Sequence, residues 1–185
     1  MGANFKFVNA GYPIHAAVEA AMSLVDKHKI AVNAIASVHV GMPANAMRVV
    51  DNRQMHNICM QDMVCSALLR SGLRLPESPF PEILDDPAFA RMRARITLGV
   101  DPGLERDQPD GRGSNVTINT ADGSTFSECV DRPRGHSMRG GVTWSDLSEK
   151  WHAGLPNYDV DRILIMARRL DELTDLSDLL AAPVS

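Results

Sequence analysis

The stretch Val116-Thr-Ile-Asn-Thr-Ala-Asp-Gly-Ser-Thr-Phe-Ser-Glu-Cys-Val130 decides the fold class, because it reads as two strands joined by a tight turn. Apolar and polar residues alternate before the turn, as in a strand with one buried face. Asp122-Gly123 supplies the residue types that tight hairpin turns favour. The sequence therefore predicts a β-hairpin with strands at 116–120 and 125–130.

The flanking sequence completes the fold prediction. Residues 34–40 and 96–100 are two further strand candidates, and helices are predicted at 13–29, 57–70 and 87–93. Helices at 143–152, with Thr143 and Asp146 resembling a capping box, and at 159–170 follow the hairpin. This order favours one α+β domain over 1–185, with an antiparallel sheet of about four strands packed against helices.

Composition excludes several classes of function. The chain has 185 residues, of which 44% are hydrophobic and 23% charged, and a net charge of −4, which argues against nucleic-acid binding. Apolar runs fall short of the ~18 residues that a membrane span needs. Three cysteines without a metal-binding spacing or a secretory signal indicate a reducing, cytoplasmic environment.

Several motifs, each weak alone, occur in an order that resembles the smaller, C-terminal domain of the MmgE/PrpD family. That family includes 2-methylcitrate dehydratase, cis-aconitate decarboxylase and iminodisuccinate epimerase. The motifs are Lys6-Phe-Val-Asn-Ala-Gly-Tyr-Pro-Ile-His15, Asp51-Asn-Arg53, Gln61-Asp-Met-Val-Cys-Ser-Ala-Leu-Leu69, Val100-Asp-Pro-Gly-Leu104, the hairpin, Asp131-Arg-Pro-Arg-Gly-His136 and Thr143-Trp-Ser-Asp-Leu147.

The resemblance implies a part of a lyase or isomerase that acts on small di- or tricarboxylates by acid/base proton transfer, without a metal or organic cofactor. It implies as partner the family's large helical domain, which we expect to be absent from this chain and supplied by the same gene or a separate polypeptide. Without that domain the chain is expected to be inert. A homo-oligomer such as a dimer is also expected.

One position departs from the family pattern. Decarboxylase-like members carry Lys-x-x-x-x-His at the start of the small domain, whereas the fifth residue after Lys6 is Gly11. A function that needs this histidine is therefore in doubt. The alternative, from a different class, is a non-catalytic ligand-binding or protein-interaction module that retains the fold.

Lys6 and His15 are the candidate catalytic residues. The Lys6 ammonium can pair with a carboxylate or stabilise an enolate-like charge, although a solvated lysine is the ordinary alternative. His15, in a first helical turn, can act as an acid/base group near neutral pH. Its structural alternative is a partly buried ring that orients the turn at Tyr12-Pro13.

Arg53 and Gln61 are the candidate substrate-binding residues. The planar guanidinium of Arg53 suits bidentate recognition of a carboxylate, but it can equally pair with Asp51 or cap a helix. Gln61 can complete a polar wall of the pocket or pack at a domain interface. The basic turn Arg132–His136 is interpreted as architectural.

A docking surface for the helical domain is predicted on the first helix and on the face formed by Met60, Met63 and Val64. Large exposed apolar patches commonly mark such contacts.

Overall fold

A computed structural model describes residues 3–70, 81–106 and 111–177. The chain divides into two compact units, Met1–Gly141 and Val142–Ser185, and each is considered by itself. In the described ranges, every helix is too short or too polar to cross a bilayer.

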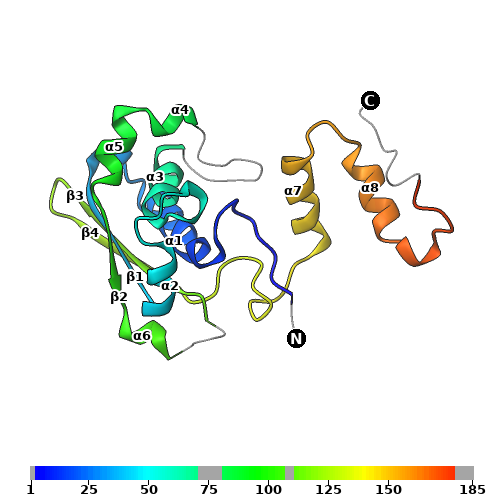
Figure 1. Cartoon of the computed structure of the whole chain (residues 1–185), viewed down its shortest axis with the longest axis horizontal. Helices are drawn as coiled ribbons and strands as arrows, with labels where there is room; N and C mark the ends of the chain where they lie inside the picture. Colours follow the sequence, from blue (N-terminus) through cyan, green and yellow to red (C-terminus); the bar gives the residue numbers. More distant parts are fainter. Residues whose placement is uncertain (1–2, 71–80, 107–110, 178–185) are drawn as a thin grey trace. The chain divides into compact units, whose positions relative to one another are not determined.

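The first unit contains one four-stranded sheet (Figure 1). Its strands are β1 (Ile35–Met42), β2 (Ile96–Val100), β3 (Ser114–Thr120) and β4 (Thr125–Val130), in the order β2-β1-β3-β4. β3 pairs antiparallel with β1 and β4, whereas β2 runs parallel to β1. The α+β prediction and the hairpin are confirmed. The parallel pair arises because the chain crosses back through several helices between β1 and β2.

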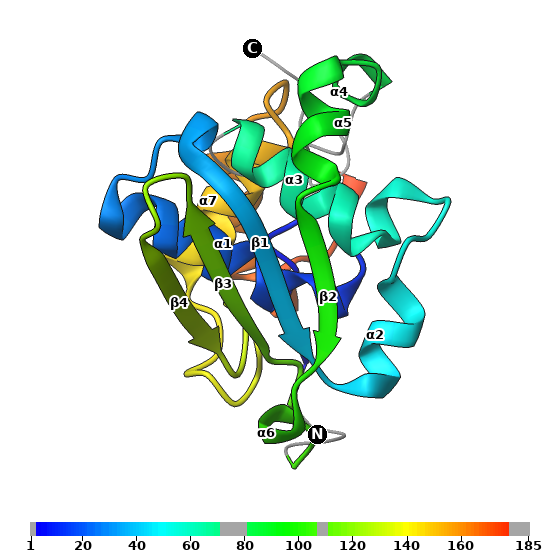
Figure 2. The same cartoon turned by 90° about the vertical axis from the view of Figure 1, so that its left-hand side faces the viewer.

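The helices of this unit lie mostly behind one face of the sheet (Figure 2). They are α1 (His15–His28), α2 (Ala44–Val50), α3 (Met60–Arg70), α4 (Pro81–Leu84), α5 (Pro87–Arg93) and α6 (Pro102–Glu105). Single 3-10 turns occur at Tyr12–Ile14, Val32–Ala34 and His56–Ile58. The 3-10 turn before α1 explains why the helix starts two residues later than Pro13, where the sequence placed it.

The core lies between α1, α3 and the covered face of the sheet. Met60, Met63 and Val64 are fully buried in it, as are Ala17 and Leu24 of α1. The predicted docking surface on α1 and the Met60–Val64 face is therefore wrong. The apolar stripes of both helices are used within the unit, because a four-stranded sheet needs such a cover to bury its own apolar face.

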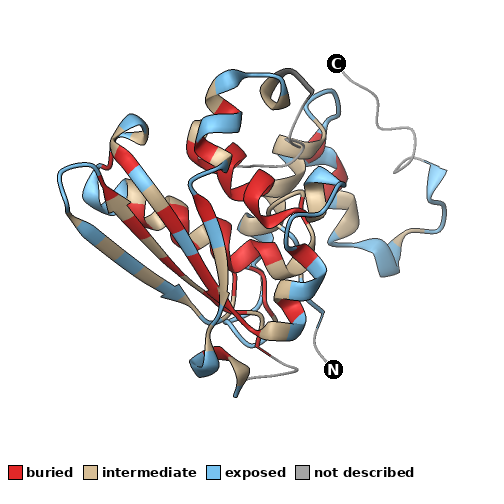
Figure 3. Ribbon diagram, turned by 60° about the vertical axis from the view of Figure 1, so that its left-hand side comes forward, coloured by how far each residue is buried: buried red, intermediate tan, exposed pale blue. Residues whose placement is uncertain are grey.

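The opposite face of the sheet is more exposed (Figure 3), and its side chains are mostly polar. Side-chain hydrogen bonds cross the strands on this face, from Asn119 to Ser37 at 2.9 Å and between Thr117 and Ser127 at 2.8 Å. These pairs follow from the strand period of two, which sends alternate side chains away from the helices.

The second unit contains α7 (Trp144–Gly154), α8 (Val160–Ala167) and a 3-10 turn at Leu170–Glu172. The predicted capping box is confirmed, because Thr143 accepts from the Asp146 amide while Asp146 accepts from the Thr143 amide. Only Val160, Ile163 and Leu164 are buried among the described residues of this unit, and Ile165 is largely exposed.

Candidate functional site

Lys6 and His15 meet at one backbone carbonyl near the N-terminus. The Lys6 ammonium donates to the oxygen of Ala10 at 3.1 Å, and Nε2 of His15 lies 3.4 Å from the same atom. The 3-10 turn Tyr12–Ile14 reverses the chain between them, with Pro13 in its first positions. Two of the four candidates are therefore brought together by local structure.

His15 is held in its place by burial. Its residue is only 2% exposed, and the Tyr12 ring lies 5.2 Å from its own ring, centroid to centroid. Burial lowers the pKa of His15 to about 4; the hydrogen bond to Ala10 opposes this, and the charge of Lys6 adds to it. The imidazole is therefore neutral near pH 7 and shielded from solvent, whereas Lys6 is exposed.

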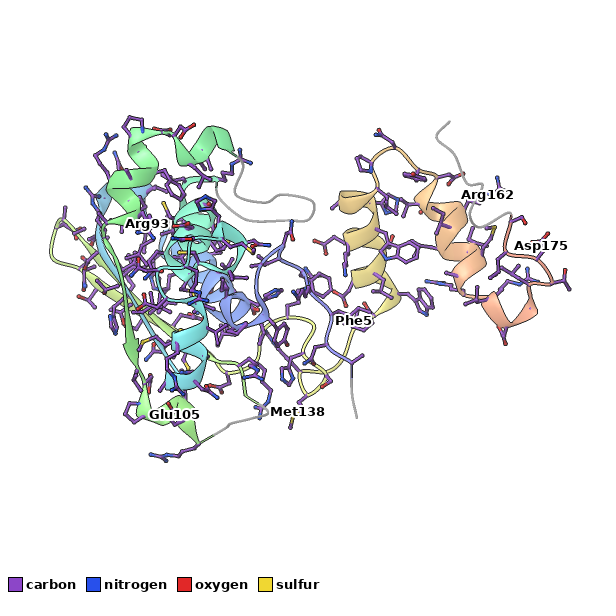
Figure 4. The ribbon with its side chains drawn as sticks, in the orientation of Figure 1. Phe5, Arg93, Glu105, Met138, Arg162 and Asp175 are labelled. Carbon is purple, nitrogen blue, oxygen red and sulfur yellow. The ribbon has the colours of Figure 1, made fainter. Side chains whose placement is uncertain are left out.

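The basic turn holds the segment that carries Lys6. The amide of Phe5, labelled in Figure 4, donates to the Gly135 oxygen at 2.9 Å, and the Arg134 guanidinium lies 4.3 Å from the centre of the Phe7 ring. Gly135 has φ +85°, and a Cβ there would stand 2.3 Å from the Phe5 oxygen. These contacts agree with the architectural interpretation of this turn.

Gln61 supports the turn that precedes Arg53. Its side-chain amide donates to Asp51 Oδ1 at 2.6 Å, and its oxygen accepts from the Asn52 amide at 3.0 Å. Asn52 has φ +45°, a strained conformation that these bonds compensate. Gln61 is buried, while Arg53 is exposed and has no hydrogen-bond or ion-pair partner among the described residues.

The two segments that carry the candidates are joined at Gly11. Its amide donates to the Asn57 oxygen at 2.7 Å, and a Cβ on it would lie 3.3 Å from Cγ2 of Ile58. A side chain at this position would push against the 51–58 loop. The structure thus pairs Lys6 with His15 and associates Gln61 with Arg53, but it records no direct contact between the two pairs.

Sequence reasoning did not predict the ionic cluster around the buried Asp62 at the start of α3. The carboxylate of Asp62 accepts from Nδ1 of His56 at 2.5 Å and from Nε of Arg93 at 2.5 Å. The signal in the sequence was a single acid inside the apolar run Met60–Leu69. Arg93, at the end of α5 and labelled in Figure 4, could not be assigned to it because only tertiary packing brings α5 to α3.

Two hollows lined by described residues do not include any of the four candidates. One, of about 440 Å³, is lined by Glu19, Glu128, Arg132 and Arg139 among others, and another, of about 400 Å³, by Val32, Leu69 and Met92. Within the described residues, no group of three His, Cys, Asp or Glu side chains has the geometry of a metal site.

Comparison with known proteins now supplies the family. The sequence profile of the MmgE/PrpD C-terminal domain matches residues 9–172, which is most of the chain. The chain belongs to the MmgE/PrpD family. The resemblance to the C-terminal domain that the motifs indicated is thereby confirmed.

A curated relative supports the same assignment. The chain is 30% identical over 161 residues to a protein described as 2-methylcitrate dehydratase from Cupriavidus necator. The match covers 79% of this chain and 33% of the relative. The chain therefore spans about a third of the length of this curated relative.

The family assignment leaves the roles of the individual side chains as predictions. The matched range begins at residue 9, so it includes His15, Arg53 and Gln61 but not Lys6. At Gly11, the close approach of Ile58 and the hydrogen bond to Asn57 give a local physical reason for a residue without a side chain.

Proposed function

We propose that this chain is the C-terminal domain or subunit of an MmgE/PrpD-type lyase or isomerase. Its substrates are small di- or tricarboxylates, and its chemistry is acid/base proton transfer, without a metal or organic cofactor. Dehydration, decarboxylation and epimerisation all begin beside a carboxylate, and each places negative charge that cationic side chains can stabilise.

One observation carries the proposal: two exposed cations are each supported by a buried polar residue. The Lys6 ammonium shares the Ala10 carbonyl with buried His15, and Arg53 follows the turn held by buried Gln61. In this proposal Lys6 and Arg53 contact the substrate carboxylates, and His15 and Gln61 support the backbone segments that carry them. The Lys6 side chain is already held by its hydrogen bond to Ala10, so it loses little freedom when it binds an anion.

The similarity to a 2-methylcitrate dehydratase supports the tricarboxylate class. The chain also covers only a third of that relative, which supports a further requirement. We infer that the opposite wall of the cleft comes from an MmgE/PrpD-type helical domain, on the same polypeptide or a separate one, and that the 185-residue chain alone is inert.

The test measures turnover of the tricarboxylates 2-methylcitrate and citrate, and of small dicarboxylates. The chain is assayed alone and together with an MmgE/PrpD helical domain. We expect turnover only in the combination, and a loss of about tenfold or more in kcat/KM for Lys6→Ala and Arg53→Ala. Lys27→Ala and Arg48→Ala remove other exposed cations and serve as matched controls. Turnover by the chain alone contradicts the requirement for a partner, and wild-type kinetics in both site variants contradict the site.

A non-catalytic binding module is the second candidate, and Gly11 favours it because decarboxylase-like members carry histidine there. The discriminating measurement is calorimetric titration of the chain with 2-methylcitrate. Binding that Lys6→Ala and Arg53→Ala weaken, together with no turnover in any combination, would establish the module.

The same proposal places the protein in the cytoplasm as a homo-oligomer, such as a dimer. Cys59 and Cys65 are buried free thiols and Cys129 is an exposed one, which suits a reducing compartment. Light scattering coupled to size-exclusion chromatography measures the oligomeric state directly, and a monomeric mass at micromolar concentration would contradict this part.

A further inference from the structure

His56 has one ring nitrogen, Nδ1, bound to a buried carboxylate, while its side chain is about half exposed. Its Nδ1 lies 2.5 Å from Oδ2 of Asp62, and its side chain is 47% exposed while that of Asp62 is 4% exposed. An ionised carboxylate only accepts hydrogen bonds, so the ring carries its proton on Nδ1 when it is neutral. Nε2 is then the nitrogen left to exchange a proton with a bound molecule.

Arg93 gives the buried carboxylate its second partner. Nε of Arg93 donates to Oδ1 of Asp62 at 2.5 Å, and its Nη2 donates to Asn52 at 3.1 Å and lies 3.6 Å from Cys59 Sγ. Burial lowers the pKa of Arg93, but the hydrogen bond and charge of Asp62 outweigh it, so the pKa is raised. A buried carboxylate stays charged only with such partners, and here His56 and Arg93 also fix the orientation of the Asp62 carboxylate.

The arrangement of His56, Asp62 and Arg93 is suited to an acid/base group with a fixed orientation. A buried aspartate fixes the tautomer of an imidazole and balances the positive charge that the ring gains on protonation. The titratable or charged groups around this site include Asp62 and Cys65 of α3, Cys59 just before it, and Arg93 at the end of α5.

The remaining described histidines lack this combination. His15 and His136 are buried, and one ring nitrogen of each is bonded to a backbone atom. His39 bonds Thr97 on the polar face of the sheet, and the His28 ring packs on Phe126. His152 faces Asp161 at 3.5 Å, where both side chains are largely exposed.

We propose that His56 is the general acid that this domain contributes, with Asp62 and Arg93 as positioning residues; this rests on the proposed function. In a dehydration, the C–O bond breaks and its electron pair remains on the hydroxyl oxygen. That oxygen takes the proton from Nε2 of protonated His56 and leaves as water. The base of the helical domain takes the C–H proton, and the C–H electron pair forms the double bond. The base then releases its proton to solvent, and solvent returns a proton to His56.

The kinetic test uses the chain combined with an MmgE/PrpD helical domain and 2-methylcitrate as substrate. His56→Gln should lower kcat about 100-fold or more, the usual size of a general-acid contribution, while KM changes only a few-fold. The fall of kcat at alkaline pH should disappear in the variant, which a purely structural residue would not cause. His39→Gln is the matched control and should keep wild-type kinetics and pH profile.

A spectroscopic test needs no turnover. In the ¹⁵N spectrum of the 185-residue chain, neutral His56 should carry its proton on Nδ1, and Asp62→Asn should shift it to Nε2 because the amide can donate to Nδ1. A wild-type ring protonated on Nε2 overturns the inference whatever the kinetics show.

Arg93→Lys, which keeps the charge but loses the planar donor, should reduce kcat by a smaller factor than Asp62→Asn.

The outcomes separate the two proposals. Turnover that survives in His56→Gln within threefold of wild type overturns the acid role and leaves the proposed function standing. Absence of turnover by wild type with every acid and partner overturns the proposed function and the acid role with it. Circular dichroism of each variant tests whether a loss of turnover comes from unfolding.

Discussion

Two histidine–aspartate pairs in this chain show how much burial decides. His56 and Asp62 lie 2.5 Å apart with the carboxylate 4% exposed, whereas His152 and Asp161 lie 3.5 Å apart with the carboxylate 79% exposed. The residue types are the same. The first pair is part of a packed unit, while the second joins two helices of a unit with few buried residues.

The difference follows from what surrounds each carboxylate. Asp62 is in α3, whose neighbours on the same helix are buried against the sheet and α1, so water reaches it poorly. Asp161 remains solvated, and solvent screens its attraction to His152. An ion pair therefore holds a fixed geometry only where the fold removes the water around it.

The largest expected effect is on the buried pair. Asp62→Ala should lower the free energy of unfolding by about 3 kcal/mol, because it leaves Arg93 and His56 without their shared acceptor. The estimate is at the low end of such losses, since water reaches the outer parts of both partners. Asp161→Ala should change it by about 0.5 kcal/mol or less. Urea unfolding of both variants measures the two free energies of unfolding. Equal losses of stability would contradict the contrast between the two pairs.

A buried histidine without a carboxylate extends the comparison to pH. The pKa of His15 is about 4 in the folded chain and near 6.5 when unfolded, so the unfolded chain binds more protons between these values. The free energy of unfolding should therefore fall as pH drops from 6.5 to 4, by on the order of 3 kcal/mol from this residue. His15→Gln should lose that component. Parallel pH curves for wild type and variant would contradict the burial argument.

A pair of glycines isolates the support of the Lys6 segment. Gly135 and Gly140 have φ +85° and +77°, but only a Cβ at Gly135 would meet the Phe5 oxygen, whereas at Gly140 nothing lies within 4 Å. Gly140→Ala should cost about 1 kcal/mol from backbone strain, and Gly135→Ala about 2 kcal/mol or more. Faster hydrogen exchange at the Phe5 amide in Gly135→Ala alone would confirm the cause; equal exchange in both would refute it.

The smallest effect is expected at the start of α7. Thr143→Ala removes one half of the capping box and should lower the free energy of unfolding of the second unit by about 1 kcal/mol. Ser145→Ala, which removes a neighbouring exposed hydroxyl, is the control and should be nearly neutral. Loss of α7 helicity, followed by circular dichroism on heating, measures this effect. A neutral Thr143→Ala would show that this unit does not depend on its caps.

Much of the candidate site followed from local sequence. The Tyr12-Pro13 turn brings Lys6 and His15 to one carbonyl within a single short segment, and Gln61 reaches back to Asp51 and Asn52 over ten residues or fewer. Such contacts depend on turn chemistry that neighbouring residues encode. The partnership of Asp62 with Arg93 spans 31 residues and was not predictable, because it depends on how α5 packs against α3.

The sequence by itself determined the α+β class, the β3–β4 hairpin, the capping box and the family, since each is written in short-range periodicity or in ordered motifs. Only the tertiary structure decided that β2 joins β1 in parallel, and that the methionine face of α3 is core and not a docking surface. The physical reason is that an apolar stripe records that a surface will be buried but not which surface will bury it. Likewise, a charged residue in the sequence does not reveal whether the folded chain leaves it in water or encloses it with its partners.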